Sequence, residues 1–397
     1  MVVFLLLALL PLIVFKYYNF INDSIQDILS SFGISGGLPG LNWAIPIGIS
    51  FYSFQAVGYF LDVYHKRVAA ERNWWDYMLF VSFFPQILSG PISRAEDLIP
   101  QIKKERQFDY NQNVAGLKAL LWGMFMKCVF ADRIAIYADT IFNNYSHLNA
   151  ASLWLGSFAY TLQIYGDFAG YSLMAVGVGK CLGFDLINNF KRPYFASSIT
   201  EFWKRWHISL TRWLTSHIYI AMGGNRCSKI RQYWNIIVTF LVSGIWHGAN
   251  WTFIVWGLIH GIIQVIEKAL GLDPKGINST RGIIKRLKPL RVITTFVVVD
   301  IAWIFFRQPT IKDAINYVMM MFSKGNITLK SEYPTQVLLI LALVIVFIKE
   351  IAEEYFPSIQ LFNNRNAIIR WSTYLAVLCM IALFGVLDST QFIYVSF

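Results

Sequence analysis

The stretch NIIVTFLVSGIWHGANWTFIVWGLIHGIIQVI, residues 235–266, decides the fold class of this chain. It consists of two apolar runs separated by the short polar break HGAN at residues 247–250. Each run approaches the roughly 20 apolar residues that span the hydrocarbon core of a bilayer. We therefore interpret the stretch as two successive membrane spans that meet at His247.

Apolar runs of the same kind recur along the whole chain, at residues 2–15, 292–306, 337–348 and 374–387. Shorter runs are interrupted by Gly, Pro and charge, as at residues 45–64 and 79–92. Interrupted runs predict tilted, broken or re-entrant helices, which at membrane depth usually line a cavity. We predict an all-α polytopic membrane protein with about nine to eleven transmembrane or re-entrant helices.

The composition supports this class. Hydrophobic residues make up 56% of the chain and charged residues only 14%, which is more apolar side chain than the interior of one soluble domain absorbs. The formal charge of +11 would suggest nucleic-acid binding in a soluble protein. Here the basic residues lie in short loops beside apolar runs, as the positive-inside rule predicts, so we expect a lipid bilayer and no nucleic acid as partner.

No linker, charge block or repeat divides the sequence, so we expect one membrane domain over residues 1–397. The most basic loop, residues 268–291, is expected to be cytoplasmic. The span before His247 then runs outward and brings His247 toward the external half of the membrane. The opposite orientation stays open, because residues 307–330 are basic too.

His247 is the first candidate site residue, with the small residues Gly244, Gly248 and Ala249 leaving space around its imidazole. An ionisable residue at membrane depth is costly without a function or a partner. A neutral imidazole also suits acyl transfer, since it can take the proton from an attacking hydroxyl. An inert histidine, hydrogen-bonded to a carbonyl at a helix end, remains the alternative.

His207 is the second candidate and lies within residues 199–231, where Trp203, Trp206, Leu210 and Trp213 recur at helical spacing. This spacing predicts one amphipathic helix, lying at the membrane interface or lining a polar cavity. A histidine on the polar face of such a helix needs no function, so this pattern alone favours a structural role.

Asp167 interrupts a long apolar run in the motif YGDFAGY, residues 165–171. A carboxylate at such depth should face the protein interior and pair with a lysine, arginine or histidine. We therefore expect a structural pairing for Asp167.

Other patterns carry less weight. Ser35 matches the G-x-S-x-G pattern in form, but it follows no strand and we do not expect a nucleophile there. The glycine turn at residues 223–226 has basic neighbours that would attract an anion such as a coenzyme phosphate. If one helix joined His247 to His260, the two would lie roughly 20 Å apart, and no other metal-ligand spacing appears, so we expect no metal.

Taken together, the motifs resemble the membrane-bound O-acyltransferase superfamily, in particular the bacterial branch that O-acetylates alginate, peptidoglycan and other exopolysaccharides. The matching stretches follow the family order and span most of the chain: LNWAIPIGISFYSFQ (41–55), FFPQILSGPI (83–92), YGDFAGYS (165–172), EFWKRWHISL (201–210), GGNR (223–226), WHGANWTF (246–253) and QFIY (391–394).

The resemblance implies a ring of membrane helices around a thin, water-accessible tunnel, with catalytic histidines at the WHG and RWH positions. These positions are His247 and His207 in this sequence. Supporting residues of the tunnel or its polar network are expected to be Asp167, Arg205, Trp246, Asn250 and Asn225.

The resemblance also implies the reactants and the location. The acyl donor would be cytoplasmic acetyl-CoA, and the acceptor a polysaccharide outside the cell. A partner of the SGNH-hydrolase-like acetyltransferase type would complete the transfer to the sugar. The protein would be a multi-pass component of the bacterial inner membrane.

The sequence departs from the family pattern in three places. Relatives usually have about two additional helices before the point where this chain starts, so we expect the N-terminus to be truncated. Thr215-Ser216-His217 stands where relatives often have an Arg-Asp pair, which leaves a polar relay there without support. Leu173 replaces an aspartate common in relatives, so Asp167 is the remaining acid of that pair.

The main hypothesis is therefore an acetyl-CoA-dependent polysaccharide O-acetyltransferase. A second hypothesis within the superfamily is transfer of D-alanine from a carrier-protein thioester to teichoic acid. A hypothesis from a different class is a transporter of polysaccharide or small molecules, in which the intramembrane His and Asp relay protons.

Overall fold

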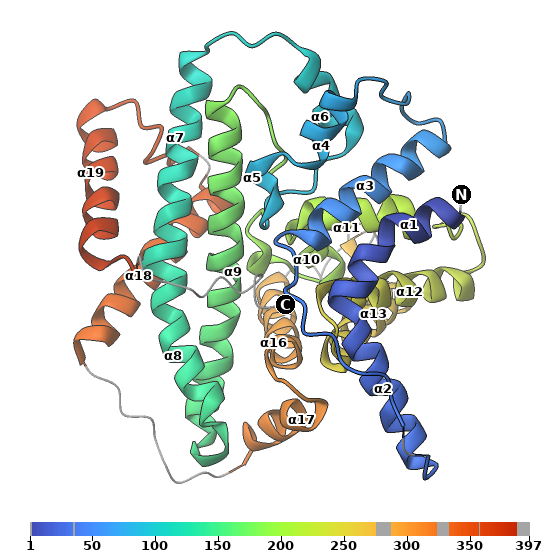
Figure 1. The fold of residues 1–397 in the computed structure, drawn as a ribbon. Helices are drawn as coiled ribbons and strands as arrows, with labels where there is room; N and C mark the ends of the chain where they lie inside the picture. Colours follow the sequence, from blue (N-terminus) through green and yellow to red (C-terminus); the bar gives the residue numbers. More distant parts are fainter. Residues whose placement is uncertain (1, 35, 275–286, 324–332, 357, 387–397) are drawn as a thin grey trace.

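The computed structural model describes the chain except residues 1, 35, 275–286, 324–332, 357 and 387–397. Within the described residues every regular element is a helix (Figure 1). In chain order the helices are α1 (Val2–Leu12), η1 (Ile13–Tyr17), α2 (Tyr18–Ser31), α3 (Ile49–Tyr64), α4 (Trp74–Val81), α5 (Phe84–Ile87), α6 (Ala95–Lys103), α7 (Tyr110–Met124), η2 (Phe125–Ala131), α8 (Asp132–Asn143), η3 (Tyr145–His147), α9 (Ala150–Cys181), η4 (Pro193–Phe195), α10 (Ile199–Arg205), α11 (Ile208–Leu214), η5 (Thr215–Tyr219), α12 (Lys229–His247), α13 (Trp251–Ala269), α16 (Lys288–Arg307), α17 (Ile311–Met320), α18 (Tyr333–Tyr355) and α19 (Ala367–Phe384).

Among the described residues, five helices are long and apolar enough to cross a membrane: Val3–Ser31, Tyr110–Asn143, Trp251–Ala269, Lys288–Arg307 and Ala367–Phe384. At most 50% of the apolar window of each is buried inside the protein, so much of this apolar surface faces outward. Lipid is the environment that accepts such surface. The predicted class, an all-α polytopic membrane protein, is confirmed, and short helices such as α4 and α5 match the predicted broken segments.

Helices α7, η2 and α8 form one long rod, and α9 runs beside it (Figure 1). Glycines let the two backbones approach closely. A Cβ on Gly123 would lie 2.6 Å from the carbonyl oxygen of Gly170, and a Cβ on Gly177 would lie 2.7 Å from that of Gly116. Small residues at an interface are the usual means of packing helices in membranes.

Helices α12 and α13 form a second tight pair. A Cβ on Gly244 would lie 2.4 Å from the carbonyl oxygen of Phe253, and a Cβ on Gly257 would lie 2.4 Å from that of Phe240. Helix α16 packs on α13. At this junction lie the fully buried indoles of the core, Trp206, Trp256 and Trp303.

The segment after residue 199 differs from the prediction. Instead of one amphipathic helix over residues 199–231, the chain forms the short helices α10 and α11, which are separated at His207. His207 has a φ of 43°, in the left-handed region that a residue with a Cβ rarely adopts. Both flanking helices place their tryptophans in the interior, so the predicted apolar face exists but belongs to two helices.

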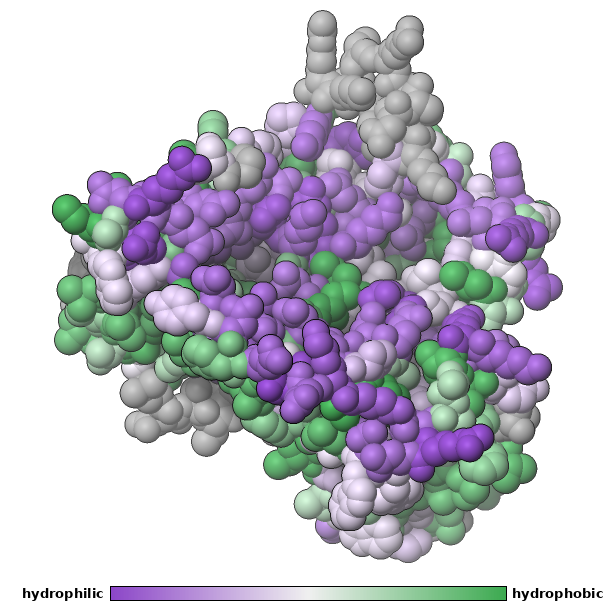
Figure 2. Space-filling model, turned by 90° about the horizontal axis from the view of Figure 1, so that it is seen from above, coloured by the Kyte–Doolittle hydropathy of each residue, from purple (hydrophilic) through white to green (hydrophobic). Residues whose placement is uncertain are grey.

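One end of the helix assembly is strongly polar. Figure 2 shows the face at the top of Figure 1, over which hydrophilic residues predominate. The connectors between α3 and α4 and between α6 and α7 lie at this end (Figure 1). They carry Lys66, Arg67, Arg72, Lys104 and Arg106. The connector between α2 and α3, at the other end, has no lysine or arginine in its sequence.

Candidate active site

His247 is the last residue of α12 and lies deep inside the protein, with 4% of its surface exposed. The chain leaves the helix at Gly248, which is extended, and Asn250 starts α13 by accepting a hydrogen bond from the Thr252 N–H. The break predicted from the sequence HGAN is therefore confirmed, and it turns the chain back on itself directly after the imidazole.

Aromatic rings surround the His247 imidazole on several sides. Its ring centroid lies 4.8 Å from that of Trp246, 4.9 Å from that of Trp256 and 5.3 Å from that of Phe306. Such a wall excludes water and lowers the local dielectric constant, which strengthens the electrostatic interactions of any reacting group beside it.

His207 is fully buried at the junction of α10 and α11. Its Nδ1 lies 3.3 Å from Asn189 Oδ1, which also accepts hydrogen bonds from the Ser209 N–H at 3.0 Å and the Ser209 hydroxyl at 2.9 Å. The Asn189 amide nitrogen donates to Ser172 Oγ at 3.1 Å. Asn189 thus joins the loop before α10 to α9 and to His207.

These contacts decide which nitrogen of His207 carries its proton. A backbone N–H can only donate, so the Asn189 atom facing Ser209 is the oxygen, and the facing Nδ1 of His207 must be the protonated nitrogen. The lone pair of a neutral imidazole is then on Nε2, for which no side chain or backbone group in the described part of the chain is a hydrogen-bond partner. His207 therefore presents a proton acceptor to the site.

The two candidate histidines, 40 positions apart in sequence, meet in space. Their ring centroids lie 6.5 Å apart. The edge of Phe168, from α9, packs against His207 at 4.7 Å, and Trp246 lies 5.8 Å from His207 on the side of His247. The structure thus brings together the two histidines that the family resemblance indicated.

A small cavity of about 80 Å³ opens beside His247. Its polar lining comes from Lys16, Ser50 and His247, and its apolar lining from Trp246, Leu88 and the segment around Pro46. Gly48, in this segment, has a φ of 74°, and a Cβ there would lie 2.3 Å from the carbonyl oxygen of Ile87. Only glycine fits this close approach.

A larger cavity of about 310 Å³ lies between α10, α11, α12 and α13. Its polar part comes from Lys204, Lys268, Asp273 and Asn225, with two lysines and one carboxylate, and Trp203 and Phe240 belong to its apolar part. Asn225 Oδ1 accepts a hydrogen bond from the Lys268 ammonium at 3.0 Å. Asn225, predicted as a supporting residue of the tunnel, lines this cavity. The lysines that line it are Lys204 and Lys268 rather than the basic neighbours of the glycine turn, which were expected to attract an anion.

The two cavities approach the same histidine. Ser243, which lines the large cavity, and His247, which lines the small one, are one helical turn apart on α12. The ring of Trp203, from the wall of the large cavity, lies 5.7 Å from that of Trp256, which also packs on His247.

Three of the predicted supporting residues lie away from these cavities. Asp167 faces η2, where the Lys127 ammonium lies 2.5 Å from Asp167 Oδ1 and 2.7 Å from Asp132 Oδ1, so its predicted pairing with a cation is present. Arg205 forms ion pairs with Glu201 at 2.7 Å and Glu354 at 3.0 Å. Asn250 caps α13 and donates to the carbonyl of Pro309 at 2.8 Å. All three hold helices together, whereas Trp246 lines the small cavity.

His260 is closer to His247 than a single helix would allow. Because the chain turns back at Gly248, both histidines pack on Trp256, with centroid distances of 4.9 Å for His247 and 5.0 Å for His260. His260 Nδ1 accepts a hydrogen bond from Trp203 Nε1 at 3.3 Å. Among the described residues, no group of three or more His, Cys, Asp or Glu side chains has the arrangement of a metal site.

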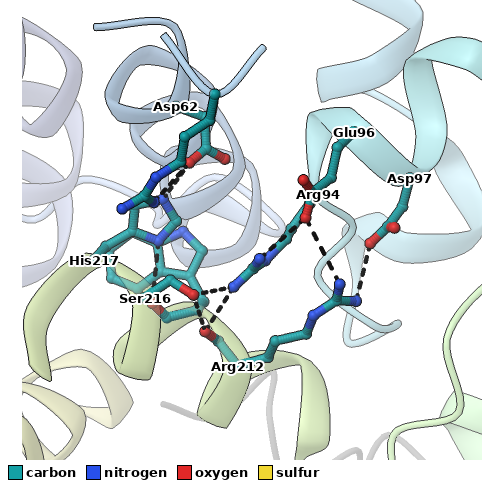
Figure 3. Close-up of polar contacts among 9 residues, drawn as sticks. Asp62, Arg94, Glu96, Asp97, Arg212, Ser216 and His217 are labelled. Atoms are coloured by element: carbon teal, nitrogen blue, oxygen red, sulfur yellow. Dashed lines mark hydrogen bonds and ion pairs between the residues drawn. The ribbon is translucent and has the colours of Figure 1, made fainter. Parts of the chain in front are cut away.

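Ser216 and His217 take part in a polar cluster that the sequence comparison gave no reason to expect (Figure 3). His217 Nε2 lies 3.1 Å from Asp62 Oδ1, and the Arg94 guanidinium donates to the Ser216 hydroxyl and to the Arg212 carbonyl. Arg212 in turn pairs with Asp97 at 3.1 Å. The cluster ties α3 and α6 to the end of α11. None of these residues lines the small or the large cavity.

Sequence reasoning missed Lys16, Ser50 and Asn189. Lys16 directly follows the apolar run 2–15, so its position in the sequence is that of a cation at the end of a membrane span. Ser50 lies in a matched family stretch, but nothing in the pattern distinguishes it there. Ser35 and the closing stretch 391–394 lie outside the described residues, as does the middle of the basic loop 268–291.

The comparisons with known proteins cover the part of the chain that contains these residues. The profile of the MBOAT, membrane-bound O-acyltransferase family, matches residues 67–272, which include both histidines. The chain is 40% identical over 347 residues to a probable alginate O-acetylase AlgI of Azotobacter vinelandii, covering 86% of this chain and 67% of that protein. It is 35% identical over 341 residues to a peptidoglycan O-acetyltransferase of Helicobacter pylori, covering 79% and 63%.

A teichoic acid D-alanyltransferase of Streptococcus thermophilus is more distant, at 29% identity over 294 residues, covering 69% of this chain and 65% of that protein. The chain therefore spans about two thirds of the length of the curated relatives that it matches.

Proposed function

The chain belongs to the membrane-bound O-acyltransferase family, and on this premise we propose that it is a membrane O-acetyltransferase that passes acetyl groups to a polysaccharide outside the cytoplasm. The observation that carries the proposal is the position of His247, which borders the small cavity one helical turn from the large one. A donor and an acceptor that enter from different sides would meet at this residue.

The large cavity suits the donor. Acetyl-CoA carries several phosphate charges, and the ammonium groups of Lys204 and Lys268 would attract them. The thioester end would then extend past Trp203 and Ser243 toward His247. The small cavity, with Ser50 and Lys16 in its wall, would admit the hydroxyl acceptor.

His247 would act as the general base. Its imidazole takes the proton from the attacking hydroxyl while the hydroxyl oxygen bonds to the thioester carbonyl carbon. The carbon–sulfur bond then breaks, and the coenzyme leaves as a thiol after receiving that proton. The ring centroid of His207 lies 6.5 Å from that of His247, and its hydrogen bond to Asn189 leaves Nε2 as the acceptor. His207 would hold and polarise a reactant next to the base.

The charge distribution supports a direction for the transfer. The basic connectors at the upper end of Figure 1 would face the cytoplasm, since short cytoplasmic loops are enriched in lysine and arginine. This orientation suits a multi-pass protein of the bacterial inner membrane with an acceptor, and an SGNH-hydrolase-like partner, on the external side. We treat residues 1–397 as part of one membrane-bound O-acyltransferase domain.

D-alanyl transfer to teichoic acid is the second candidate, and the lower identity to the D-alanyltransferase makes it the less favoured one. A carrier protein would then dock at the basic face in place of coenzyme A. A transporter function has no support from the family match.

The proposal is tested by releasing acetate with mild base from the surface polysaccharide of cells that express the chain with its genomic neighbours. Because a general base contributes about 10²–10⁴ in rate, His247→Ala should remove base-labile acetate while leaving the protein at its normal level in the membrane. Lys312→Ala, on the surface of α17, is the matched control and should keep wild-type acetate. Equal acetate in His247→Ala and wild type would refute the assignment, and base-labile D-alanine instead of acetate would favour the second candidate.

A further inference from the structure

A lysine is buried in the first membrane span, next to the end of the helix that carries His247. Lys16 is 9% exposed, and its ammonium donates to the carbonyl oxygens of Trp246 at 3.1 Å and His247 at 3.0 Å and to Ser50 Oγ at 3.1 Å. Among the described residues, no carboxylate forms an ion pair with it. An ionisable side chain at such depth suggests a functional role by default.

Tyr17, the next residue, reaches the same place. Its hydroxyl donates to the carbonyl oxygen of Ile245 at 2.6 Å. Both residues lie in η1, a single π-helical turn between α1 and α2, and they are the only buried residues of that turn. Such turns often occur at functional sites, because they change the direction of side chains within an otherwise regular helix.

The contacts complete the end of α12. The last four carbonyls of a helix have no partner within it, and a helix end buried without substitutes is unfavourable. The chain is extended at Gly248, and the backbone N–H of this residue does not fold back to cap α12. The carbonyls of Ile245, Trp246 and His247 are satisfied by Tyr17 and Lys16 from another part of the chain.

The charge of Lys16 suits this position. The C-terminus of a helix carries partial negative charge, which a cation stabilises. The three N–H donors of the ammonium face three oxygen atoms, so none is left over for a substrate. Lys16 also lines the small cavity together with His247, so its contacts fix the wall against which the acceptor would lie.

We propose that Lys16, supported by Tyr17, is a positioning residue of the active site: it caps α12 from the first span and thereby holds the His247 imidazole at the small cavity. This inference rests on the proposed function for its catalytic consequence. Its structural content, the capping of α12, is independent of the reaction. The first span is then part of the site and does more than fix the protein in the lipid.

The test uses the full chain purified in detergent, with Lys16→Met as the main variant. Met has a similar length and no charge, and it makes the span more apolar, so membrane insertion is preserved. Since a misplaced catalytic group costs about 10²-fold, we expect kcat for transfer from acetyl-CoA to fall about 10- to 100-fold. The KM for acetyl-CoA should stay at the wild-type value, because the donor cavity is not touched. Lys16→Arg, which keeps charge and donors, should recover much of the loss.

Tyr17→Phe removes one hydrogen bond without changing the charge and should reduce kcat less than Lys16→Met. Lys118→Met is the matched control, because the Lys118 ammonium bonds Asn363 at the exposed surface. It should behave as wild type.

A second readout does not depend on activity. The folded protein is labelled with diethyl pyrocarbonate and then digested, and mass spectrometry of the peptides gives the rate at which His247 is modified. Exposed His65 is the internal reference. Lys16→Met should change the rate at which His247 is modified, and Lys16→Arg should restore it, while His65 reacts as before.

Unchanged labelling of His247 in Lys16→Met would overturn the capping role. Wild-type kcat in Lys16→Met, with His247→Ala inactive, would overturn the catalytic role. If wild type itself transfers no acetyl group, the proposed function fails, and the labelling still decides the role of Lys16.

Discussion

The α7–η2–α8 rod with α9 and the segment from α10 to α13 both bury polar groups, but they do so in opposite ways. In the first region the buried acids Asp132 and Asp167 share Lys127. Hydroxyls of α9 donate to buried acids of neighbouring helices, Tyr165 to Glu350 of α18, and Ser157 and Thr161 to Asp300 of α16. The second region contains four buried imidazoles, and two of them, His207 and His247, lie side by side among aromatic rings next to the small cavity. We infer that the bonded acids hold the helices together, while the imidazoles beside a cavity are the groups available for chemistry.

The largest expected effect on the first region comes from breaking its central ion pairs. Lys127→Met leaves Asp132 and Asp167 without the ammonium that they share. Removing one partner of a buried pair costs about 3–5 kcal/mol, so the amount of folded protein in the membrane should fall strongly. The molecules that do fold should transfer acetyl groups at nearly the wild-type rate. Fluorescence-detected size-exclusion chromatography gives the folded amount for this comparison. A folded amount equal to that of wild type would show that the pair does not hold the rod.

Packing of the same rod should respond to added volume. In Gly177→Val the new side chain meets the Gly116 carbonyl, since even a Cβ there would lie 2.7 Å from it. Overpacking typically costs about 1–3 kcal/mol, which should lower the thermal midpoint in detergent. Gly36→Val is the control, because a Cβ on Gly36 meets nothing within 4 Å. Equal midpoints for the two variants would contradict the close approach of α7 and α9.

In the second region, the hydrogen bond from His207 to Asn189 should matter for the rate of transfer per folded molecule. Asn189→Leu removes the acceptor that fixes the proton on His207 Nδ1. If His207 holds a reactant, transfer per folded molecule should fall about tenfold, which corresponds to one hydrogen bond of roughly 1.4 kcal/mol. Ser172→Ala, which removes only the hydroxyl that Asn189 donates to, should have a smaller effect. The rate per folded molecule is the quantity to measure, and an equal loss in both variants would argue that Asn189 acts only through packing.

The smallest effect is expected at the surface cluster of Figure 3. Arg212 and Asp97 are both more than 40% exposed, so Arg212→Gln should change the free energy of unfolding by less than about 1 kcal/mol. The pair of His217 with Asp62 is buried, and Asp62→Asn should cost more. Thermal midpoints of the two variants test this order, and the reverse order would contradict the burial of the His217 pair.

The sequence predicted the membrane class and the break at His247, because apolar runs and the polar HGAN stretch are local patterns. It did not predict the break at His207, since the tryptophan spacing continues through that residue while its backbone takes a left-handed turn. The packing of His247 and His260 on one tryptophan also escaped prediction, because it depends on the reversal of the chain at Gly248.

Residues that act across the fold were the hardest to find. Lys16 and Asn189 contact segments 231 and 18 positions away, and no periodicity relates such positions. Arg205 and Asn250 were expected near the tunnel because they lie in matched motifs, yet their side chains bond other helices. A motif gives the position of a residue along the chain, whereas packing decides which way its side chain points.

The most direct test of the account compares the two regions in one measurement: the rate of acetyl transfer per folded molecule for His247→Gln and Lys127→Met. We expect His247→Gln to be present at the wild-type folded level and to be inactive, whereas the smaller folded fraction of Lys127→Met should be active. Activity in His247→Gln, or its loss in correctly folded Lys127→Met, would contradict the assignment of chemistry to the histidine region and of stability to the rod.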